Sequence, residues 1–346
     1  MNRTAASIGL TRLDRAPESA WIADWDAAVA ISDDVDRFCS SSRWILPALD
    51  AFHPNDEPVI LSSDSGMAAL VRGHHDVVGQ FLTPMEATWG LASGLVAWDP
   101  DRFAVQLREA LRDEDLRVSV ALLSGLRPGR RLWRALVREL QPDYVLRPAA
   151  TSRRNVASLD GGYDGWLGRR TRKFRANLRR QARRASDRGI EVEPIVVDDA
   201  ETLRSLYDRA MALEAVSWKG LSEQGVDSEP MRSFTFDVLT RSLHARDAEV
   251  RWIVARAEGR DIGYLHGVLA GRHFRGLQMS FADAWRDAGV GSLMQATAIR
   301  WLCEDGARSY DLGSELPYKA RWAERSDPTV GLLCHPRVLV DGGSPA

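Results

Sequence analysis

Three strand-like runs follow one another in the second half of the chain, and the short connections between them leave little choice of fold. The runs cover residues 249–257, 262–270 and 273–282, and the connections are residues 258–261 and 271–272. Connections of two to four residues that contain glycine are typical of β-hairpins. The runs are therefore predicted to form an antiparallel sheet, on which the segments before and after them must pack.

The segments around these runs complete one α+β unit. A strand at 190–197 and helices at 200–218 and 231–245 precede the runs, and a helix at 292–306 and a buried strand at 309–313 follow them. This order of strand, two helices, three antiparallel strands, helix and strand predicts a single sheet covered by helices.

An amphipathic helix is predicted at the start of this half, over residues 164–189. It ends at Gly189, and glycine is common there because it adopts a left-handed conformation without strain. At about 100° per residue the apolar side chains share one face, and the opposite face is strongly cationic. The apolar face holds Leu167, Phe174, Leu178 and Ala185, and the cationic face holds Arg169, Arg172, Lys173, Arg180, Arg183 and Arg184.

The first half of the chain echoes this order more loosely. It is predicted to hold a hairpin at 58–73, helices at 99–112 and 128–140, strands at 118–123 and 143–147, and a loop from Pro148 onward. The 346 residues also exceed the roughly 250 residues at which a single core stops growing. Two units are therefore expected, residues 1–160 and residues 161–346.

Composition excludes several classes of protein. The 46 basic residues nearly cancel the 48 acidic ones, so no overall charge favours nucleic acid. The three cysteines are too scattered for a disulfide framework or a zinc site, and no metal is expected. No apolar run approaches the roughly 20 residues that cross a bilayer, and the N-terminus lacks a signal-like apolar core. We expect a cytoplasmic protein without membrane insertion, whose oligomeric state stays open.

The loop from Arg286 to Ser292 is the stretch most informative about chemistry. It reads Arg-Asp-Ala-Gly-Val-Gly-Ser and lies between a predicted strand and a predicted helix. Glycines let the backbone come close to a ligand, so that several amide groups can converge on an anion at the positive end of the helix. The residues expected to bind phosphate groups are Arg286, Ala288, Gly289, Val290, Gly291 and Ser292.

This loop resembles the acyl-CoA pyrophosphate loop of GNAT acetyltransferases, since Arg286, Gly289 and Gly291 match its pattern in full. Within that superfamily the chain resembles the CelD-like acetyltransferases associated with cellulose biosynthesis. The closer resemblance is carried by the Arg-rich segment 166–180, by Ser217-Trp218-Lys219-Gly220 and by residues 306–323. The family also resembles the Fem-type aminoacyl-tRNA-dependent transferases, which pair two GNAT-like units.

The resemblance implies two tandem GNAT-like units, each a mixed, mainly antiparallel sheet flanked by helices. The second unit would transfer an acetyl or other acyl group from acyl-CoA to an amine of a small molecule or sugar by direct attack. The strand with Gln278 and Met279 would hold the pantetheine arm. The corresponding region of the first unit, residues 89–94, lacks the phosphate-loop pattern, so that unit is expected to serve as a scaffold and substrate wall.

The base of such a reaction stays open, because the strand at 273–282 carries no acid where many GNAT enzymes have one. Glu214 is the first candidate, with Asp311 and Glu315 behind it, and His266 is the strand histidine expected to face a site. Tyr318 would protonate the departing thiolate. The residues expected to bind the acceptor are Trp218, Lys219, Glu315 and Lys319.

Two rival functions remain. Residues 169–188 hold ten basic side chains, which would suit an aminoacyl-tRNA-dependent transferase, although the same face could hold the 3′-phosphate of CoA, an acidic acceptor or only solvent. A non-catalytic binding module is the other alternative. The phosphate-type loop favours acyl-CoA over tRNA, and neither the acceptor nor the acyl chain length follows from the sequence.

Overall fold

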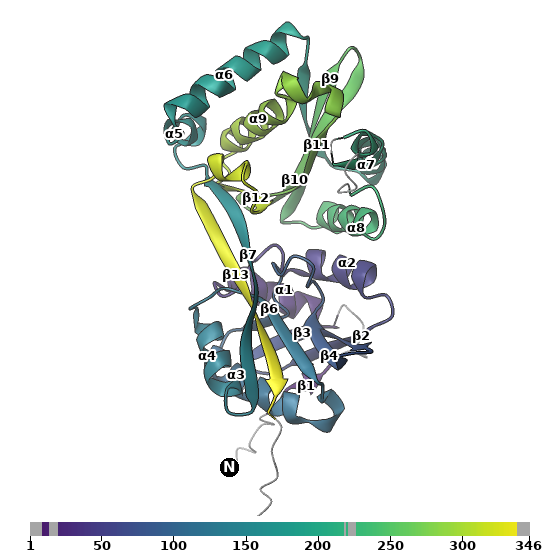
Figure 1. The fold of residues 1–346 in the computed structure, drawn as a ribbon, viewed down its shortest axis with the longest axis vertical. Coiled ribbons are helices and arrows are strands. Elements are labelled where there is room, and N and C mark those ends of the chain that lie inside the picture. The colour runs from purple at the N-terminus through teal and green to yellow at the C-terminus, as the bar shows by residue number, and fades with distance from the viewer. Residues whose placement is uncertain (1–8, 14–19, 218, 221–225, 338–346) are drawn as a thin grey trace, which may run out of the picture. The chain divides into compact units, whose positions relative to one another are not determined.

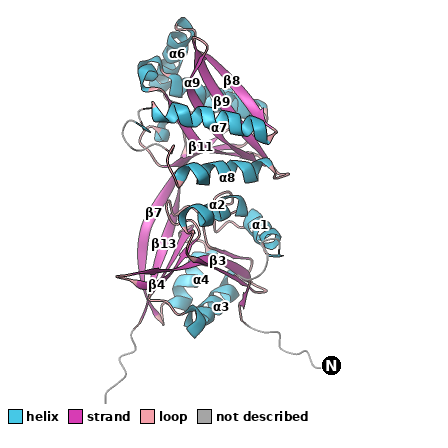
Figure 2. Cartoon of the chain, turned by 90° about the vertical axis from the view of Figure 1, so that its right-hand side faces the viewer, coloured by secondary structure: helices cyan, strands magenta, loops and turns pink. Residues whose placement is uncertain are grey.

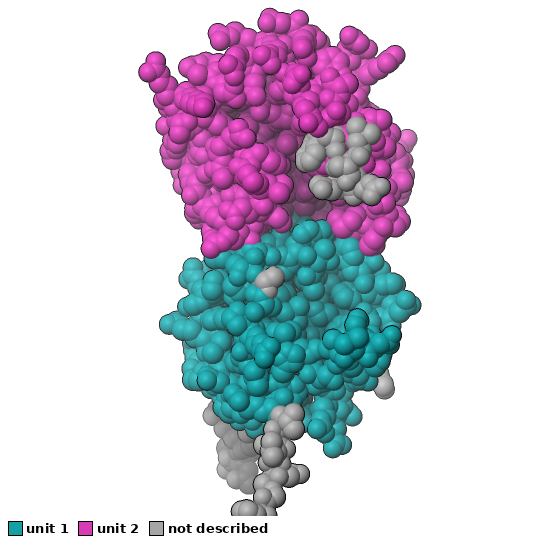
Figure 3. All heavy atoms as spheres, viewed as in Figure 1, with its two compact units in different colours: residues 1–152, 328–346 teal, residues 153–327 magenta. Residues whose placement is uncertain are grey.

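The computed structural model describes residues 9–13, 20–217, 219–220 and 226–337. The chain divides into two compact units, which Figure 3 colours separately. One contains the residues up to 152 together with those from 328 onward, and the other contains residues 153–327. The sequence placed the division after residue 160; in the structure the strand β13 (Arg325–Pro336), which the sequence did not predict, pairs with β6 (Val120–Leu126) of the first unit.

The second unit, residues 153–327, is built on one sheet. Its order is β7 (Tyr144–Ser158), β12 (Ser309–Ser314), β11 (His273–Phe281), β10 (Arg260–Ala270), β9 (Ala248–Ala257) and β8 (Glu191–Val197). All described pairs of neighbours are antiparallel except β11 with β12, which are parallel. Both predicted hairpins form, and Glu258 and Gly259 have the positive φ angles (52° and 71°) that a tight two-residue turn requires.

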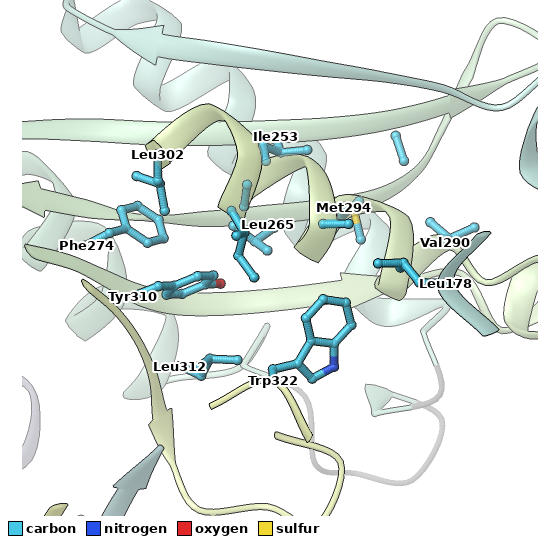
Figure 4. Close-up of a cluster of buried hydrophobic side chains, with 14 of the residues drawn as sticks. Leu178, Ile253, Leu265, Phe274, Val290, Met294, Leu302, Tyr310, Leu312 and Trp322 are labelled. Carbon is cyan, nitrogen blue, oxygen red and sulfur yellow. The ribbon is translucent and has the colours of Figure 1, made fainter. Parts of the chain in front are cut away.

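Helices cover both faces of this sheet (Figures 1 and 2). α7 (Ala200–Ala215) and α8 (Met231–Leu243) lie on one face, and α9 (Val290–Glu304) lies on the other. α5 (Gly162–Gly168) and α6 (Arg172–Asp187) pack against α9. Figure 4 shows the core between α9 and the strands, to which Ile253, Leu265, Phe274, Val290, Met294 and Leu302 contribute.

The single helix predicted over 164–189 is two helices in the structure. The Thr171 hydroxyl accepts the N–H of Phe174 (3.2 Å) and so caps a new helix at Arg172. A capping threonine competes with continuation of the preceding helix because its side chain replaces the missing backbone acceptor. Gly189 follows α6 with a φ of 64°, as predicted.

β11 carries two irregularities that shape its surroundings. His266 pairs with Gln278 and Gly267 pairs with Gly276, so Leu277 is an extra, bulged residue. β11 pairs with β12 over only three residues, His273 to Arg275, and β12 then continues beside β7. The sheet therefore opens between β11 and β12 just beyond Arg275.

The first unit repeats this topology. Its sheet runs β1 (Thr11–Arg12), β2 (Glu57–Ser62), β3 (Gly66–His75), β4 (Gly79–Pro84), β6 (Val120–Leu126) and β13 (Arg325–Pro336), and β5 (Leu95–Ala97) pairs with β3. Its helices are α1 (Ile22–Ile31), α2 (Ser42–Phe52), α3 (Pro100–Arg112) and α4 (Arg131–Leu140). β4 leads through α3 to the parallel strand β6, as β11 leads through α9 to β12. The predicted α+β fold is confirmed, although β7 continues through the loop expected at Pro148.

Candidate active site

A cavity of about 410 Å³ lies within the second unit, between α6, the end of β11 and the beginning of α9. Its walls also include Lys219 and the segment after β12. The lining residues are Phe174, Asn177, Leu178, Gln181, Lys219, Met279, Phe281, Arg286, Gly289, Gly291, Ser292, Gln295, Tyr318, Arg321 and Trp322.

The glycine turn at the start of α9 forms one end of the cavity, and the backbone at this end favours anions. Gly289 has a φ of 77°, which glycine adopts without strain, and a Cβ added to Gly291 would lie 2.9 Å from the Phe281 ring. The first helical bond recorded at this end runs from Leu293 N to Gly289 O (3.0 Å). The amide groups of residues 290–292 therefore precede the helical bonds, at an end that favours anions.

The charged residues described in the cavity lining are all positively charged. Lys219, Arg286 and Arg321 are cationic, and none of the described lining residues is acidic. Arg286 is steadied by Asp283, whose carboxylate lies 2.6 Å from its guanidinium group. The cavity is thus suited to an anionic ligand.

Packed aromatic rings form another part of the cavity wall. Trp322 stacks on Trp166 with 5.8 Å between ring centroids, and Phe174 meets Trp322 edge-on at 5.0 Å. The Trp166 indole N–H also donates to the Trp322 carbonyl (3.1 Å). These contacts fix the segment that carries Tyr318, and burial raises the pKa of the Tyr318 hydroxyl above its usual value.

Lys219 closes the side of the cavity next to β11. Its Nζ donates to the carbonyl of Met279 (2.7 Å), beyond the bulge. Burial lowers the pKa of this ammonium group, and the nearby Glu214 carboxylate opposes that effect. An amine held in this way gives up its proton more readily than a surface lysine does.

Glu214 lies behind this wall and does not line the cavity. Its side chain is fully buried, and its two oxygens accept from the Tyr264 hydroxyl (3.0 Å) and from Gln278 Nε2 (3.1 Å). The carboxylate is therefore linked to β10 and β11 at the level of the bulge. Its electrostatic link to the cavity passes through Lys219.

His266 is also buried away from the cavity. Its ring stacks on Trp252 (4.4 Å between centroids), and neither ring nitrogen has a hydrogen-bond partner among the described residues. Burial, with the charge of Lys219, lowers the pKa of the imidazole to about 3. His266 is thus a neutral core residue, which does not suit the base role expected for it.

Asp311 belongs to a buried ion cluster. It pairs with Arg154 and with Arg275 (2.8 Å), and it accepts the N–H of Gly313 (2.8 Å). Burial alone would raise the pKa of the carboxyl, but the two guanidinium charges outweigh it and hold the pKa at about 2. Such a carboxylate is a poor base, so the role expected for Asp311 does not suit its position.

Of the remaining residues expected to bind the acceptor, Glu315 and Lys319 lie outside the cavity lining. Glu315 is exposed, and Trp218 falls outside the described residues. Lys319 Nζ donates to the Ser314 carbonyl (3.0 Å). Burial lowers the pKa of Lys319 to about 8, with the charges of Arg275 and Lys219 acting in the same direction.

Residues 172–320 match a family model described as an acetyltransferase (GNAT) domain, and this stretch holds most of the cavity lining. This part of the chain is therefore similar to GNAT acetyltransferase domains. No curated protein sequence matches the chain significantly.

Three solved structures share the fold over most of the chain. A conserved protein of unknown function from Bacteroides thetaiotaomicron is 13% identical, with a TM-score of 0.61, over 91% of this chain and 97% of that protein. FemX is 13% identical, with a TM-score of 0.60, over 89% and 95%. A tandem GNAT protein from the clavulanic acid biosynthesis pathway is 12% identical, with a TM-score of 0.50, over 94% and 98%. At such identities the likeness shows the fold alone.

The cavity brings together part of the residue set expected from the sequence. Lys219, Met279, Arg286, Gly289, Gly291, Ser292 and Tyr318 line the cavity, whereas Gln278 binds Glu214, and the side chains of Ala288 and Val290 are buried in the core. The wall formed by α6 was not predicted from the sequence. The spacing of Phe174, Asn177, Leu178 and Gln181 could have indicated it, because residues three, four and seven apart share a helix face.

The first unit uses the corresponding amides internally. After β4, the buried carboxylate of Glu86 accepts the N–H groups of Trp89 (2.6 Å), Leu91 (3.2 Å) and Ala92 (3.0 Å). An internal carboxylate therefore occupies amides that would otherwise be open to an anion.

Among the described residues, no group of three or more histidine, cysteine, aspartate or glutamate side chains could hold a metal ion. In the same part of the chain no helix is both long enough and apolar enough to span a membrane.

Proposed function

We propose that the second unit is an acyl-CoA-dependent N-acyltransferase that acts on an amine of a small molecule or sugar. The observation that carries this proposal is the glycine turn, which opens the positive end of α9 onto a cavity with three cations and no described acid. Backbone amides, a helix N-terminus and guanidinium groups all favour a diphosphate.

The residues of the turn fit such a donor. A side chain at position 291 would meet Phe281, so glycine leaves the first amides of α9 open to the cavity. Arg286 adds a charge at the same end, and Met279 and Phe281 offer an apolar wall for a pantetheine arm. A bound acyl-CoA would supply a thioester whose carbonyl carbon an amine can attack.

Lys219 is our candidate for handling the proton of that amine, and Glu214 is a positioning residue behind it. Lys219 lines the cavity, and its lowered pKa makes the neutral amine more accessible at neutral pH. Both oxygens of Glu214 are already engaged, so we assign Glu214 to positioning: it limits the lowering of the Lys219 pKa and orients Gln278. The Tyr318 hydroxyl stays protonated and is the proposed proton donor to the departing thiolate.

A Fem-type aminoacyl-tRNA-dependent transferase is the second candidate, supported by the exposed cations of α6. We rank it lower because Phe174, the single aromatic residue of α6, faces the cavity and cannot stack on bases outside it. Membership of the CelD-like subgroup also remains part of the proposal.

Titration of the full chain with acetyl-CoA, a long-chain acyl-CoA and aminoacyl-tRNA tests the proposal. Calorimetry measures binding, and release of free thiol in the presence of a panel of amines measures turnover. Binding of acyl-CoA with thiol release supports an acyltransferase. Binding of tRNA alone would favour the second candidate, and binding of neither would leave a non-catalytic module.

A further inference from the structure

We infer that Arg184 of α6 and Arg188, the residue that directly follows α6, form a second anion site, outside the cavity, for the phosphate monoester on the ribose of the donor. This inference rests on the proposed function, because it concerns the nucleotide end of acyl-CoA. The site would let the protein distinguish CoA from donors that lack this phosphate.

One face of α6 changes its chemistry along the helix. Asn177 and Gln181 line the cavity, and the same face continues with Arg184 and Arg188, both exposed. At about 100° per residue these four positions lie within about 60° of one another. The face that borders the cavity therefore becomes cationic where it leaves the cavity.

Contacts place this face beside the glycine turn. A Cβ added to Gly289 would lie 3.0 Å from Gln181, and Arg184 donates to the carbonyl of Asp287 (2.8 Å), two residues before Gly289. That bond holds the Arg184 side chain next to the turn and leaves its other N–H groups for a ligand. Arg188 follows one turn later, about 6 Å further along the helix axis.

The charge at this position suits a phosphate better than an uncharged ribose. The only acid of α6, which the structure describes throughout, is Asp187. Guanidinium groups bind phosphate with paired, charge-assisted hydrogen bonds. A diphosphate at the turn and a monoester at Arg184 and Arg188 would account for this line of anion-binding groups.

An extended polyanion would use α6 differently. Arg179 is exposed on the side of the helix turned away from Asn177 and Gln181. RNA would bind the cations on both sides of α6, whereas a ribose phosphate would bind only the cations on the side that continues the cavity. Arg179 is therefore a matched control for Arg184 on the same helix.

Calorimetric titration with CoA and with 3′-dephospho-CoA tests the inference in four proteins: wild type, Arg184→Ala, Arg188→Ala and Arg179→Ala. We expect wild type to bind CoA about tenfold more tightly than 3′-dephospho-CoA at low salt. Arg184→Ala should reduce this ratio to about twofold, and Arg188→Ala should reduce it partly. Arg179→Ala should leave it unchanged, and added salt should lower it.

The outcomes separate this inference from the proposed function. Equal binding of the two nucleotides by wild type would overturn the inference and leave the donor site intact. An equal loss in Arg179→Ala and Arg184→Ala, or displacement of CoA by an RNA oligonucleotide, would also overturn it in favour of a general polyanion surface. If neither nucleotide binds, the proposed function falls and the inference falls with it.

Discussion

Replacement of Gly291 by valine tests the donor site most directly. A Cβ at this position would lie 2.9 Å from Phe281 Cε1 and 3.6 Å from Met279 Cε, so the new side chain must displace these groups and enter the cavity. If it blocks two hydrogen bonds from backbone amides to a diphosphate, at about 1.5 kcal/mol each, the free energy of binding weakens by about 3 kcal/mol. That loss corresponds to an affinity for CoA more than about a hundredfold weaker.

Calorimetry with CoA on wild type and Gly291→Val measures this change. Gly168→Val is the matched control, because it is the same exchange in the same unit at an exposed position with no heavy atom within 4 Å of the added Cβ. Thermal unfolding followed by circular dichroism checks that both variants fold. Valine has a slightly better helix propensity than glycine, which partly offsets the crowding of Phe281.

An unchanged CoA affinity in folded Gly291→Val would refute the reasoning, because the amides of the turn would then be irrelevant to binding. Weaker binding in Gly168→Val as well would show that the loss does not depend on the turn. A lower affinity confined to Gly291→Val is the expected result.

Three further predictions concern buried titratable groups. Lys219→Met should lower kcat about a hundredfold or more with little change in CoA affinity, and its pH–rate profile should lose the rise through the lowered pKa of Lys219. Asp311→Asn leaves Arg154 and Arg275 without their shared carboxylate, and urea unfolding should show a loss of about 3 kcal/mol or more. His266 stays neutral in the folded protein, with a pKa of about 3, but takes up a proton near pH 6.5 when unfolded. Stability should therefore fall as the pH falls below 6.5, by up to about 1.4 kcal/mol per pH unit, and His266→Phe should remove this part of the slope. An equal slope in both proteins would contradict the assignment.

Patterns between near neighbours in the sequence were enough to predict the elements that frame the site. The hairpins at Glu258-Gly259 and Gly271 form as expected, and the turn at Gly289 and Gly291 begins α9 beside a cavity. These features depend on backbone conformation and on hydrophobic periodicity, which act over a few residues. The α+β fold and the location of the glycine turn were therefore determined by the sequence itself.

Tertiary structure alone decided which polar side chains meet. Asp311 was a candidate base from its strand position, but Arg154, 157 residues earlier in the chain, converges on it with Arg275. Glu214 was likewise turned from the cavity toward Tyr264 and Gln278. The free energy of a charged group depends on burial and on charges within a few ångströms. Distance along the chain does not report such neighbours, so only the folded structure showed that Lys219 faces the cavity and Asp311 does not.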